Sequence, residues 1–400
     1  MSGDHIMDDT PSNTNAARII VFEHPVVAQD CVDALVNLGF LVSYMPIKEN
    51  VMRIMTDRPD YVFTINFNQY VSEACELLKI PYLAWVIDTP CYSVYDKAIN
   101  NSCSFTFMYD VAVAQRLRDQ GVKQVYHLPV AANLARINQV LQHEDDTSLA
   151  NDIVLVGNLT KTEYHSFIMP KLTTATLASC NSLIESLNTP SDTFELAEQI
   201  SEDLIASIRQ ESGYHLVGDH HLTTAEKLAY LLGREHSWRE RIELIHTLEQ
   251  RLPIRVYGNN EWQAFAKGYA GYADHYSLMP KIFKHAKINI NLARSFVEYG
   301  LPLRVFDVIS CGGFLLTNEK QDLHQLFSNG KDLVIFRDTQ DLMEICEYYL
   351  EHDAERQAVA AHGLATLMEN HTYHHRMIDM FTTVQNHLRG LPTTLSRWYI

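Results

Sequence analysis

Arg304 and Asp307 lie three residues apart at the start of an expected helix, a spacing that could serve a nucleoside diphosphate. Gly300 and Pro302 mark a turn before it, and proline suits the first turn of a helix because its missing N–H costs little there. A helix N-terminus offers free N–H groups and the positive end of its dipole to a phosphate. Arg304 could add bidentate hydrogen bonds to a diphosphate, and Asp307 could accept both hydroxyl groups of a ribose. Taken alone, the segment is equally compatible with an amphipathic helix that carries a surface Arg–Asp pair.

Further glycine and polar residues follow other expected strands in the same half of the chain. These candidates for the nucleotide site are Gly157, Asn158, Lys161, Gly258, Asn259 and Arg294. Glycine directly after a strand lets a ligand approach the backbone closely, although an ordinary tight turn explains it as well. A cationic side chain beside such a turn could reach a phosphate, whereas a lone lysine is more often solvated surface. We therefore expect these residues to converge with Arg304 and Asp307 on one anionic ligand.

Two residues nearer the N-terminus, His24 and Asp88, are candidates for acid–base chemistry. Each lies at the end of an expected buried strand, and the carboxyl ends of parallel strands border the ligand crevice. A displacement that inverts configuration needs a base for the acceptor hydroxyl, and aspartate or histidine is the usual choice. Asp88-Thr89-Pro90 could also be a simple turn, because Asp and Pro are common turn residues. The chain has no Asp-x-Asp motif and its histidine pairs lack an acidic third ligand, so we expect no metal site.

Strands and helices alternate along the chain in the manner of doubly wound, mostly parallel α/β sheets. Expected strands in the N-terminal half are 18–22, 40–46, 60–66, 81–87, 105–109 and 125–128. Expected strands in the C-terminal half are 152–156, 254–257, 287–292, 314–317 and 333–336. The polar residues 141–151 separate the two sets and are expected to act as a hinge. The sequence therefore predicts an α/β protein with two Rossmann-like domains.

The chain is expected to have four parts with different roles. They are a disordered tail (1–16), an N-terminal domain (17–145), a C-terminal domain (152–375), and a last helix and tail (376–400) that could pack back on the first domain. Within the second domain, 160–251 is expected to be a helical block. Capping boxes at Thr223-x-x-Glu226 and Ser237-x-x-Glu240 are predicted to start two of its helices.

The composition is that of a globular enzyme, with 46% hydrophobic and 20% charged residues in a chain of 400. A net charge of −17 argues against a nucleic-acid partner, so phosphate binding must rest on a few placed cations and backbone N–H groups. No apolar run reaches the length of about 18 residues that a transmembrane helix needs. The acidic N-terminus is unlike a signal peptide. Seven scattered cysteines without a C-x-x-C pair indicate reduced thiols, and we expect a cytoplasmic protein.

Several ordered segments resemble the group-1 glycosyltransferases, most closely their spore-maturation-protein (CgeB-like) branch. The main matches are A-K-I-N-I-N-L-A-R (286–294), G-L-P-L-R-V-F-D-V-I-S-C-G-G-F-L-L-T (300–317), D-L-H-Q-L-F-S-N-G-K-D-L-V-I-F (322–336) and H-T-Y-H-H-R (371–376). In the N-terminal half, W-V-I-D-T-P (85–90) and H-L-P-V-A-A-N (127–133) are similar to the same branch. The likeness is weakest between 160 and 250.

The resemblance implies two facing Rossmann-like domains, the GT-B architecture, with the donor bound by the second domain and the acceptor by the first. It places a cationic residue near the donor at Arg294. This sequence departs from the family pattern in two places. Asp307 stands where the family usually has Glu, and its reach is one methylene shorter. Retaining members have two acidic residues separated by seven others, whereas eight residues separate Glu298 from Asp307, so Glu298 either binds the donor sugar or faces solvent.

The function expected from these residues is transfer of a sugar from a nucleotide-diphosphate sugar, most simply of the UDP type, to a protein or glycan acceptor. No other cofactor is expected, and Arg294, Arg304 and a helix dipole would neutralise the leaving group without a metal. A retaining reaction is favoured by the resemblance of 298–317 to the retaining class. The alternatives are a nucleotide-sugar epimerase of the same fold and a non-catalytic nucleotide-sugar-binding partner.

Overall fold

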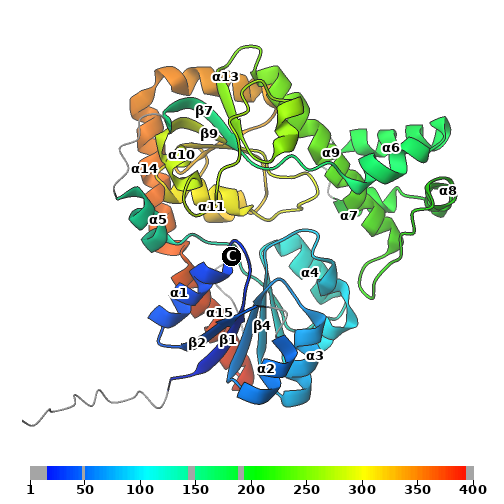
Figure 1. Ribbon diagram of the computed structural model, residues 1–400, viewed down its shortest axis with the longest axis vertical. Coiled ribbons are helices and arrows are strands. Elements are labelled where there is room, and N and C mark those ends of the chain that lie inside the picture. The colour runs from blue at the N-terminus through cyan, green and yellow to red at the C-terminus, as the bar shows by residue number, and fades with distance from the viewer. Residues whose placement is uncertain (1–15, 47–49, 143–148, 188–192, 393–400) are drawn as a thin grey trace, which may run out of the picture.

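The computed structural model describes residues 16–46, 50–142, 149–187 and 193–392. Within them lie two separate sheets, whose strands run parallel in every pair. Figure 1 shows the sheets in two domains, one above the other. This arrangement confirms the predicted fold class. Residues 1–15 of the predicted tail 1–16 and most of the predicted hinge 141–151 fall outside the described residues.

The first sheet has six strands in the order β2-β1-β3-β4-β5-β6. Its strands are β1 Arg18–Phe22, β2 Leu41–Met45, β3 Tyr61–Ile65, β4 Tyr82–Val86, β5 Ser104–Met108 and β6 Val125–His127. Its helices are α1 Ala28–Asn37, α2 Asn50–Asp57, α3 Gln69–Leu78, α4 Val111–Asp119 and α5 Leu134–Leu141. Side chains on both faces of the central strands are buried, which is why these strands are apolar runs without alternation.

The second sheet has five strands in the order β11-β10-β9-β7-β8. They are β7 Asn151–Val156, β8 Ile254–Tyr257, β9 Ala286–Asn291, β10 Leu315–Asn318 and β11 Val334–Phe336. The helices from the helical block onward are α6 Thr174–Ser186, α7 Thr193–Glu198, α8 Glu202–Ser212, α9 Thr224–Leu248, α10 Met279–His285, α11 Leu303–Ser310, α12 Leu323–Leu326, α13 Thr339–Glu351, α14 Asp353–Asn370 and α15 Tyr373–Leu388. The expected helix after Pro302 is α11, and Gly312 ends it in the left-handed region at φ 67°.

The helical block has a core of its own and projects from the side of the second domain (Figure 1). Its longest helix, α9, begins with the predicted capping box between Thr223 and Glu226. The second predicted capping box is wrong, because Ser237 lies fully buried in the middle of α9. An N-cap residue needs non-helical backbone, and the packing of α9 on both sides of Ser237 keeps the helix continuous.

The chain returns to the first domain at its end. Met377, Met380, Phe381 and Val384 of α15 share one apolar core with residues of the first sheet. Arg376 of α15 is fully buried, and its Nε donates to the carbonyl oxygen of Pro129 at 2.7 Å. In Figure 1, α15 lies behind β1 and β2 while α14 runs down from the second domain. The last helix therefore ties the two domains together.

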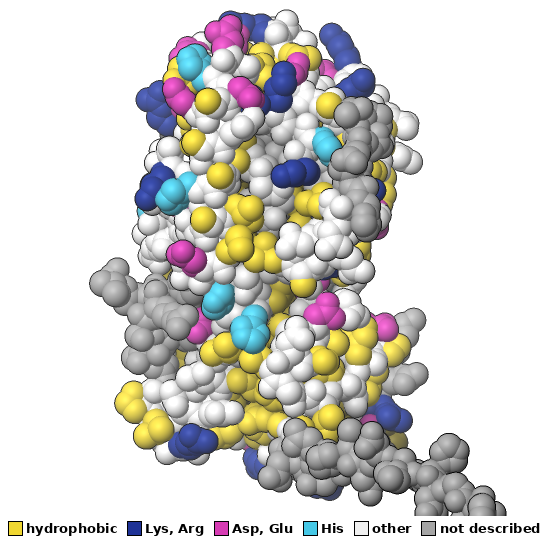
Figure 2. Space-filling model, turned by 90° about the vertical axis from the view of Figure 1, so that its left-hand side faces the viewer, with side chains coloured by type: hydrophobic (Ala, Val, Ile, Leu, Met, Phe, Trp, Pro, Cys, Tyr) yellow, Lys and Arg dark blue, Asp and Glu magenta, His cyan; other side chains and the backbone are white. Residues whose placement is uncertain are grey.

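The two domains meet over a narrower zone. Figure 2 shows a constriction between the upper and lower parts, with histidine side chains beside it. In Figure 1, α11 lies on the side of the second domain that faces the first domain. None of the helices in the described part of the chain combines the length and apolarity of a membrane span.

Candidate functional site

Three arginines converge at the carboxyl ends of β7 and β9, two neighbouring strands of the second sheet. Each donates to a backbone carbonyl oxygen at a strand end: Arg304 Nε to Val156 at 3.1 Å, Arg294 Nη2 to Asn158 at 3.4 Å, and Arg241 Nη2 to Leu292 at 2.6 Å. Arg304 comes from α11, Arg294 from the loop after β9 and Arg241 from α9. The predicted pair of Arg294 and Arg304 is thus brought together, and the structure adds Arg241.

These cations repel one another in a partly desolvated place. Burial, with the positive charges of Arg294 and Arg304, lowers the pKa of Arg241 to about 9, and the charge of Glu240 only opposes this. Burial also lowers the pKa of Arg294 and of Arg304. The buried Nε of Arg241 makes no hydrogen bond to any described residue. Like charges held together at this cost indicate a site for a polyanion, which would relieve the repulsion and supply the acceptor for the Nε–H group.

Asp307 forms an ion pair with Arg304, with 3.0 Å between Oδ2 and Nη1. The alternative of an Arg–Asp pair is therefore realised, but it is not a surface pair, since the side chains are only 18% and 12% exposed. The carboxyl of Asp307 also borders a small cavity shared with His275 and Met279 of the second domain and Arg136 of α5. A ribose hydroxyl at this carboxylate would compete with Arg304 for it.

The two glycine turns contact each other. A Cβ on Gly258 would lie 2.3 Å from the carbonyl oxygen of Gly157, so only glycine fits there. The Asn158 side-chain oxygen accepts from the N–H of Asn259 at 3.1 Å, and the Asn259 side-chain oxygen accepts from the N–H of Leu159 at 2.9 Å. Loop packing thus accounts for Gly258 and for these contacts of both asparagines. The turns nevertheless bring Asn158 beside Arg294, as expected for one site.

Lys161 lies further along the loop after β7. Its side chain is exposed, and its backbone N–H donates to Glu261 at 2.7 Å. No described contact joins Lys161 to the three arginines. The solvated-surface interpretation accounts for what is seen of this residue.

His24 and Asp88 lie together at the carboxyl edge of the first sheet. His24 Nε2 is 3.9 Å from Asp88 Oδ2, and the Asp88 side chain is 62% exposed. Burial lowers the pKa of His24, and the negative charge of Asp88 opposes this shift only in part. The pair therefore presents a neutral imidazole and an accessible carboxylate, and either could take a proton from a hydroxyl.

Asn66, which the sequence analysis did not single out, completes this cluster. Its Nδ2 donates to Asp88 Oδ2 at 2.6 Å, and its Oδ1 accepts from the N–H of Ile87 and of Asp88. Asn66 follows β3 and has a φ of 61°, a conformation that asparagine tolerates better than most residues. The sequence signal that could have identified Asn66 is an asparagine directly after an apolar strand.

Glu298 is buried at the interface of the two domains, in the loop between β9 and α11. Its backbone N–H donates to Asp110 Oδ2 of the first domain at 3.0 Å. Lys320 donates to the backbone carbonyl oxygens of Val297 and Glu298. The alternative in which Glu298 faces solvent is therefore wrong. Asp110 and Lys320 carried no sequence signal beyond being charged residues after strands.

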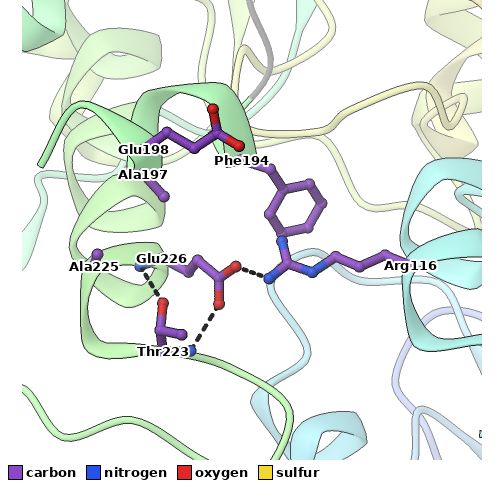
Figure 3. A pocket seen from close by; sticks show the side chains of 7 residues that line it. All are labelled: Arg116, Phe194, Ala197, Glu198, Thr223, Ala225 and Glu226. Atoms are coloured by element: carbon purple, nitrogen blue, oxygen red, sulfur yellow. Dashed lines mark hydrogen bonds and ion pairs between the residues drawn. The ribbon is translucent and has the colours of Figure 1, made fainter. Parts of the chain in front are cut away.

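A second contact between the domains borders a cavity of about 390 Å³ between α4 and the helical block (Figure 3). Arg116 of α4 points into it, pairs with Glu226 of α9 and lies 3.7 Å above the ring of Phe194. The other oxygen of Glu226 accepts from the backbone N–H of Thr223 at 2.7 Å, closing the capping box. The helix N-terminus of α9 is thus joined to the first domain.

Comparison with known proteins identifies the type of fold and domain. Residues 234–382 match the family model described as glycosyl transferase-like. The structure of HepE from Anabaena in complex with UDP and glucose is similar over 94% of this chain and 100% of that chain, with a TM-score of 0.50 and 10% identity. A glycosyltransferase from Rickettsia africae is similar over 94% of this chain and 99% of that chain, with a TM-score of 0.52 and 10% identity. Sucrose-phosphate synthase from Thermosynechococcus elongatus is similar over 94% of this chain and 100% of that chain, with a TM-score of 0.50 and 10% identity. No curated protein sequence matches the chain.

Fold and family model support a glycosyltransferase. The architecture is GT-B, as predicted, and the family match covers the C-terminal part of the second domain. The match contains Arg241, Arg294, Glu298, Arg304 and Asp307, whereas the glycine turn at 157–158 and the whole first sheet lie before it. The part of this glycosyltransferase that matches the family is therefore the part with the arginine cluster.

Within the described ranges, no three His, Cys, Asp or Glu side chains are placed to hold one ion. His371 precedes α15, and its Nδ1 lies 2.9 Å from Arg376 Nη2. The cationic groups at the site are arginines, and these are the residues that could meet a diphosphate.

Proposed function

We propose that this glycosyltransferase uses a nucleoside diphosphate sugar, of the UDP type, as donor, and a protein or glycan as acceptor. The observation that carries the proposal is the convergence of Arg241, Arg294 and Arg304 on one strand edge. Three cations at carbonyl oxygens suit a ligand with two or more negative charges. The structure of HepE with UDP-glucose supports the choice of UDP. Membership of the CgeB-like branch and a cytoplasmic location stay predictions.

The arginines would act on the leaving group. In the transfer, the bond between the anomeric carbon and the phosphate oxygen breaks, and a bond from that carbon to the acceptor oxygen forms. Negative charge grows on the departing diphosphate, and fixed cations at a desolvated site stabilise it more in the transition state than in the bound donor. Arg241, Arg294 and Arg304 would supply this charge, so we propose a metal-independent reaction.

The acceptor proton has two possible destinations. In a retaining reaction it goes to the departing phosphate, and Asp88 and His24 would only orient the acceptor. In an inverting reaction Asp88 or His24 takes it. The resemblance of 298–317 to retaining enzymes favours retention, with Glu298 at the donor sugar.

The test is a transfer and hydrolysis assay with a panel of nucleotide sugars in excess EDTA, with NMR of the product anomer. We expect release of the nucleoside diphosphate and a retained anomer. Conversion of the donor without cleavage would identify an epimerase, and binding without either reaction would identify a binding partner. Loss of all turnover in EDTA, with recovery on added Mg²⁺ or Mn²⁺, would contradict the metal-free reaction.

Asp88→Asn distinguishes the two proton routes, with exposed Asp119→Asn as matched control in the same domain. If Asp88 is the base, transfer should fall by about 10²–10⁴-fold and the product should be inverted. A modest loss with a retained anomer, which we expect, leaves Asp88 as an acceptor-orienting residue.

A further inference from the structure

The carboxylate of Asp110 crosses the interface between the domains. Asp110 follows β5 and is the N-cap of α4, where its Oδ1 accepts from the N–H of Ala112 at 3.0 Å. Its Oδ2 accepts from the N–H groups of Glu298 at 3.0 Å and Tyr299 at 3.2 Å, in the loop of the second domain. The residue is completely buried. One side chain thus caps a helix of one domain and binds a loop of the other.

Lys320 binds the backbone carbonyl groups of the same loop. Its Nζ donates to the carbonyl oxygens of Val297 and Glu298. The peptide groups around Glu298 therefore lie between a carboxylate, which accepts hydrogen bonds from their N–H groups, and an ammonium group, which donates hydrogen bonds to their C=O groups. Hydrogen bonds to charged partners are about twice as strong as neutral ones, so the backbone of this loop is strongly fixed.

Steric fit holds the loop in the same place. A Cβ on Gly300 would lie 2.8 Å from the ring of Tyr109 and 3.0 Å from Cα of Asp110, so the loop touches the first domain directly. The backbone of Gly300 is not in the left-handed region, so glycine is needed here only because the loop approaches the first domain closely. A larger residue would push the loop away from Asp110.

Two further side-chain contacts lie between the domains near this loop. Arg116, also on α4, pairs with Glu226 of α9 (Figure 3). His127 at the end of β6 lies 3.3 Å from Asp322, both fully buried. The Asp322 N–H donates to the carbonyl oxygen of Tyr299 at 3.3 Å, so this pair also meets the loop.

We propose that Asp110 is a positioning residue through which the first domain holds Glu298 in place for the donor sugar. The inference rests on the proposed function, since Glu298 is the candidate sugar-binding residue. When the domains are apart, the N–H groups of Glu298 and Tyr299 lose this acceptor, and of the two charged partners only Lys320 still holds the loop. The sugar end of the donor site is then complete only when the domains meet, whereas the arginine cluster belongs to the second domain alone.

The test is Asp110→Ser. Serine is as good an N-cap as aspartate, so α4 keeps its cap, but the shorter uncharged side chain does not reach Glu298. Asp96→Ser is the matched control, because Asp96 caps Ala98 at 2.8 Å within the first domain. Asp110→Asn is a second variant that keeps the shape and removes the charge. Amide hydrogen exchange, UDP affinity and transfer kinetics are measured on the full chain.

In Asp110→Ser we expect faster exchange at the amides of Glu298 and Tyr299, unchanged UDP affinity, and a kcat lowered by on the order of 10²-fold. Exchange and kcat equal to those of Asp96→Ser would overturn the inference, as would a loss of UDP affinity equal to the loss of kcat. The exchange arm needs no substrate. A wild-type protein that acts on no nucleotide sugar therefore overturns the proposed function, while slow exchange at Glu298 that depends on Asp110 separately shows the contact.

Discussion

Arg241 is the residue whose environment is hardest to explain by folding alone. It is 7% exposed, lies near two other arginines, and its Nε has no hydrogen-bond partner among the described residues. Glu240 only partly offsets this positive charge, and buried cations that repel one another reduce stability, so a residue kept in this state usually serves a ligand. The positive sign of the cluster stands out in a chain with a net charge of −17.

We expect Arg241→Met to weaken UDP binding by about 1.5–3 kcal/mol, the usual worth of a hydrogen bond to a charged group. Removal of the repelled charge should offset the loss of the hydrogen bond to the Leu292 carbonyl oxygen, so the free energy of unfolding should fall by less than in a variant that only leaves carbonyl acceptors unpaired. Titration calorimetry and urea denaturation measure the two quantities.

The control is Arg376→Met, since Arg376 is also buried and donates to the carbonyl oxygens of Pro129 and Asn370, as Arg241 donates to that of Leu292. That variant should lose at least about 1–3 kcal/mol of stability, because it leaves buried acceptors unpaired. An Arg241→Met protein that is as destabilised as Arg376→Met, with full UDP affinity, would make Arg241 a structural residue.

At this scale the sequence predicted residues with a local signal and missed those placed by tertiary contacts. Arg304 and Arg294 were found because each stands beside an expected strand or helix end. Arg241 lies within a long helix, where nothing local distinguishes an arginine that faces a strand end from one in solvent. Asp110 is likewise read as an ordinary N-cap until the second domain is present.

Among the elements, α9 has two different surroundings. Leu228, Ala229 and Leu232 in its first half belong to the core of the helical block, and Leu244 and Leu248 in its second half belong to the core on the second sheet. The residues between them face the loop after β9: His236 Nδ1 lies 2.9 Å from the Ser295 hydroxyl. The helical block is thereby connected to the loop after β9.

The titration of His236 should report on this packing. Burial lowers its pKa to about 4, so between pH 6.5 and 4 the unfolded chain binds a proton that the native protein does not. Stability from this group is therefore present above pH 6.5 and is lost as the pH falls towards 4, by at most about 1.4 kcal/mol per pH unit. Glu240 acts in the opposite direction, because burial raises its pKa to about 7.

Urea denaturation at pH 6.5 and pH 5 isolates His236 if wild type is compared with His236→Gln. Wild type should lose up to about 2 kcal/mol more than the variant over this interval. His324→Gln, at an exposed histidine, is the control and should follow wild type. Equal losses in wild type and His236→Gln would show that α9 is not closely packed on the loop after β9.

Element prediction succeeded where periodicity and caps agreed, and failed where tertiary packing decided. The strands of both sheets were found because each is a short apolar run between turn residues. The helices α2 and α5 were missed because each has only eight residues, although Asn133 caps α5. At Ser237 the opposite error occurred: the sequence pattern predicted the start of a helix, but Ser237 lies inside α9, which stays continuous because it packs against two apolar cores.

The whole molecule is two domains joined at several points. The chain crosses between them after α5 and again before α15, and Asp110, Arg116 and His127 add contacts between side chains. The fold class could be predicted because alternation of strand and helix leaves few topologies. How the domains meet could not, since these contacts join residues more than 100 positions apart, and no pattern in the sequence pairs them.

The central claim is that the arginine cluster binds the diphosphate of a nucleotide donor. Titration calorimetry of nucleoside diphosphates, UDP first, against their monophosphates tests it most directly, because each pair differs only in the second phosphate. We expect one site for UDP and an affinity for UMP lower by at least about tenfold, or 1.4 kcal/mol. Equal affinities within every pair, or no binding of any nucleoside diphosphate, would contradict the claim.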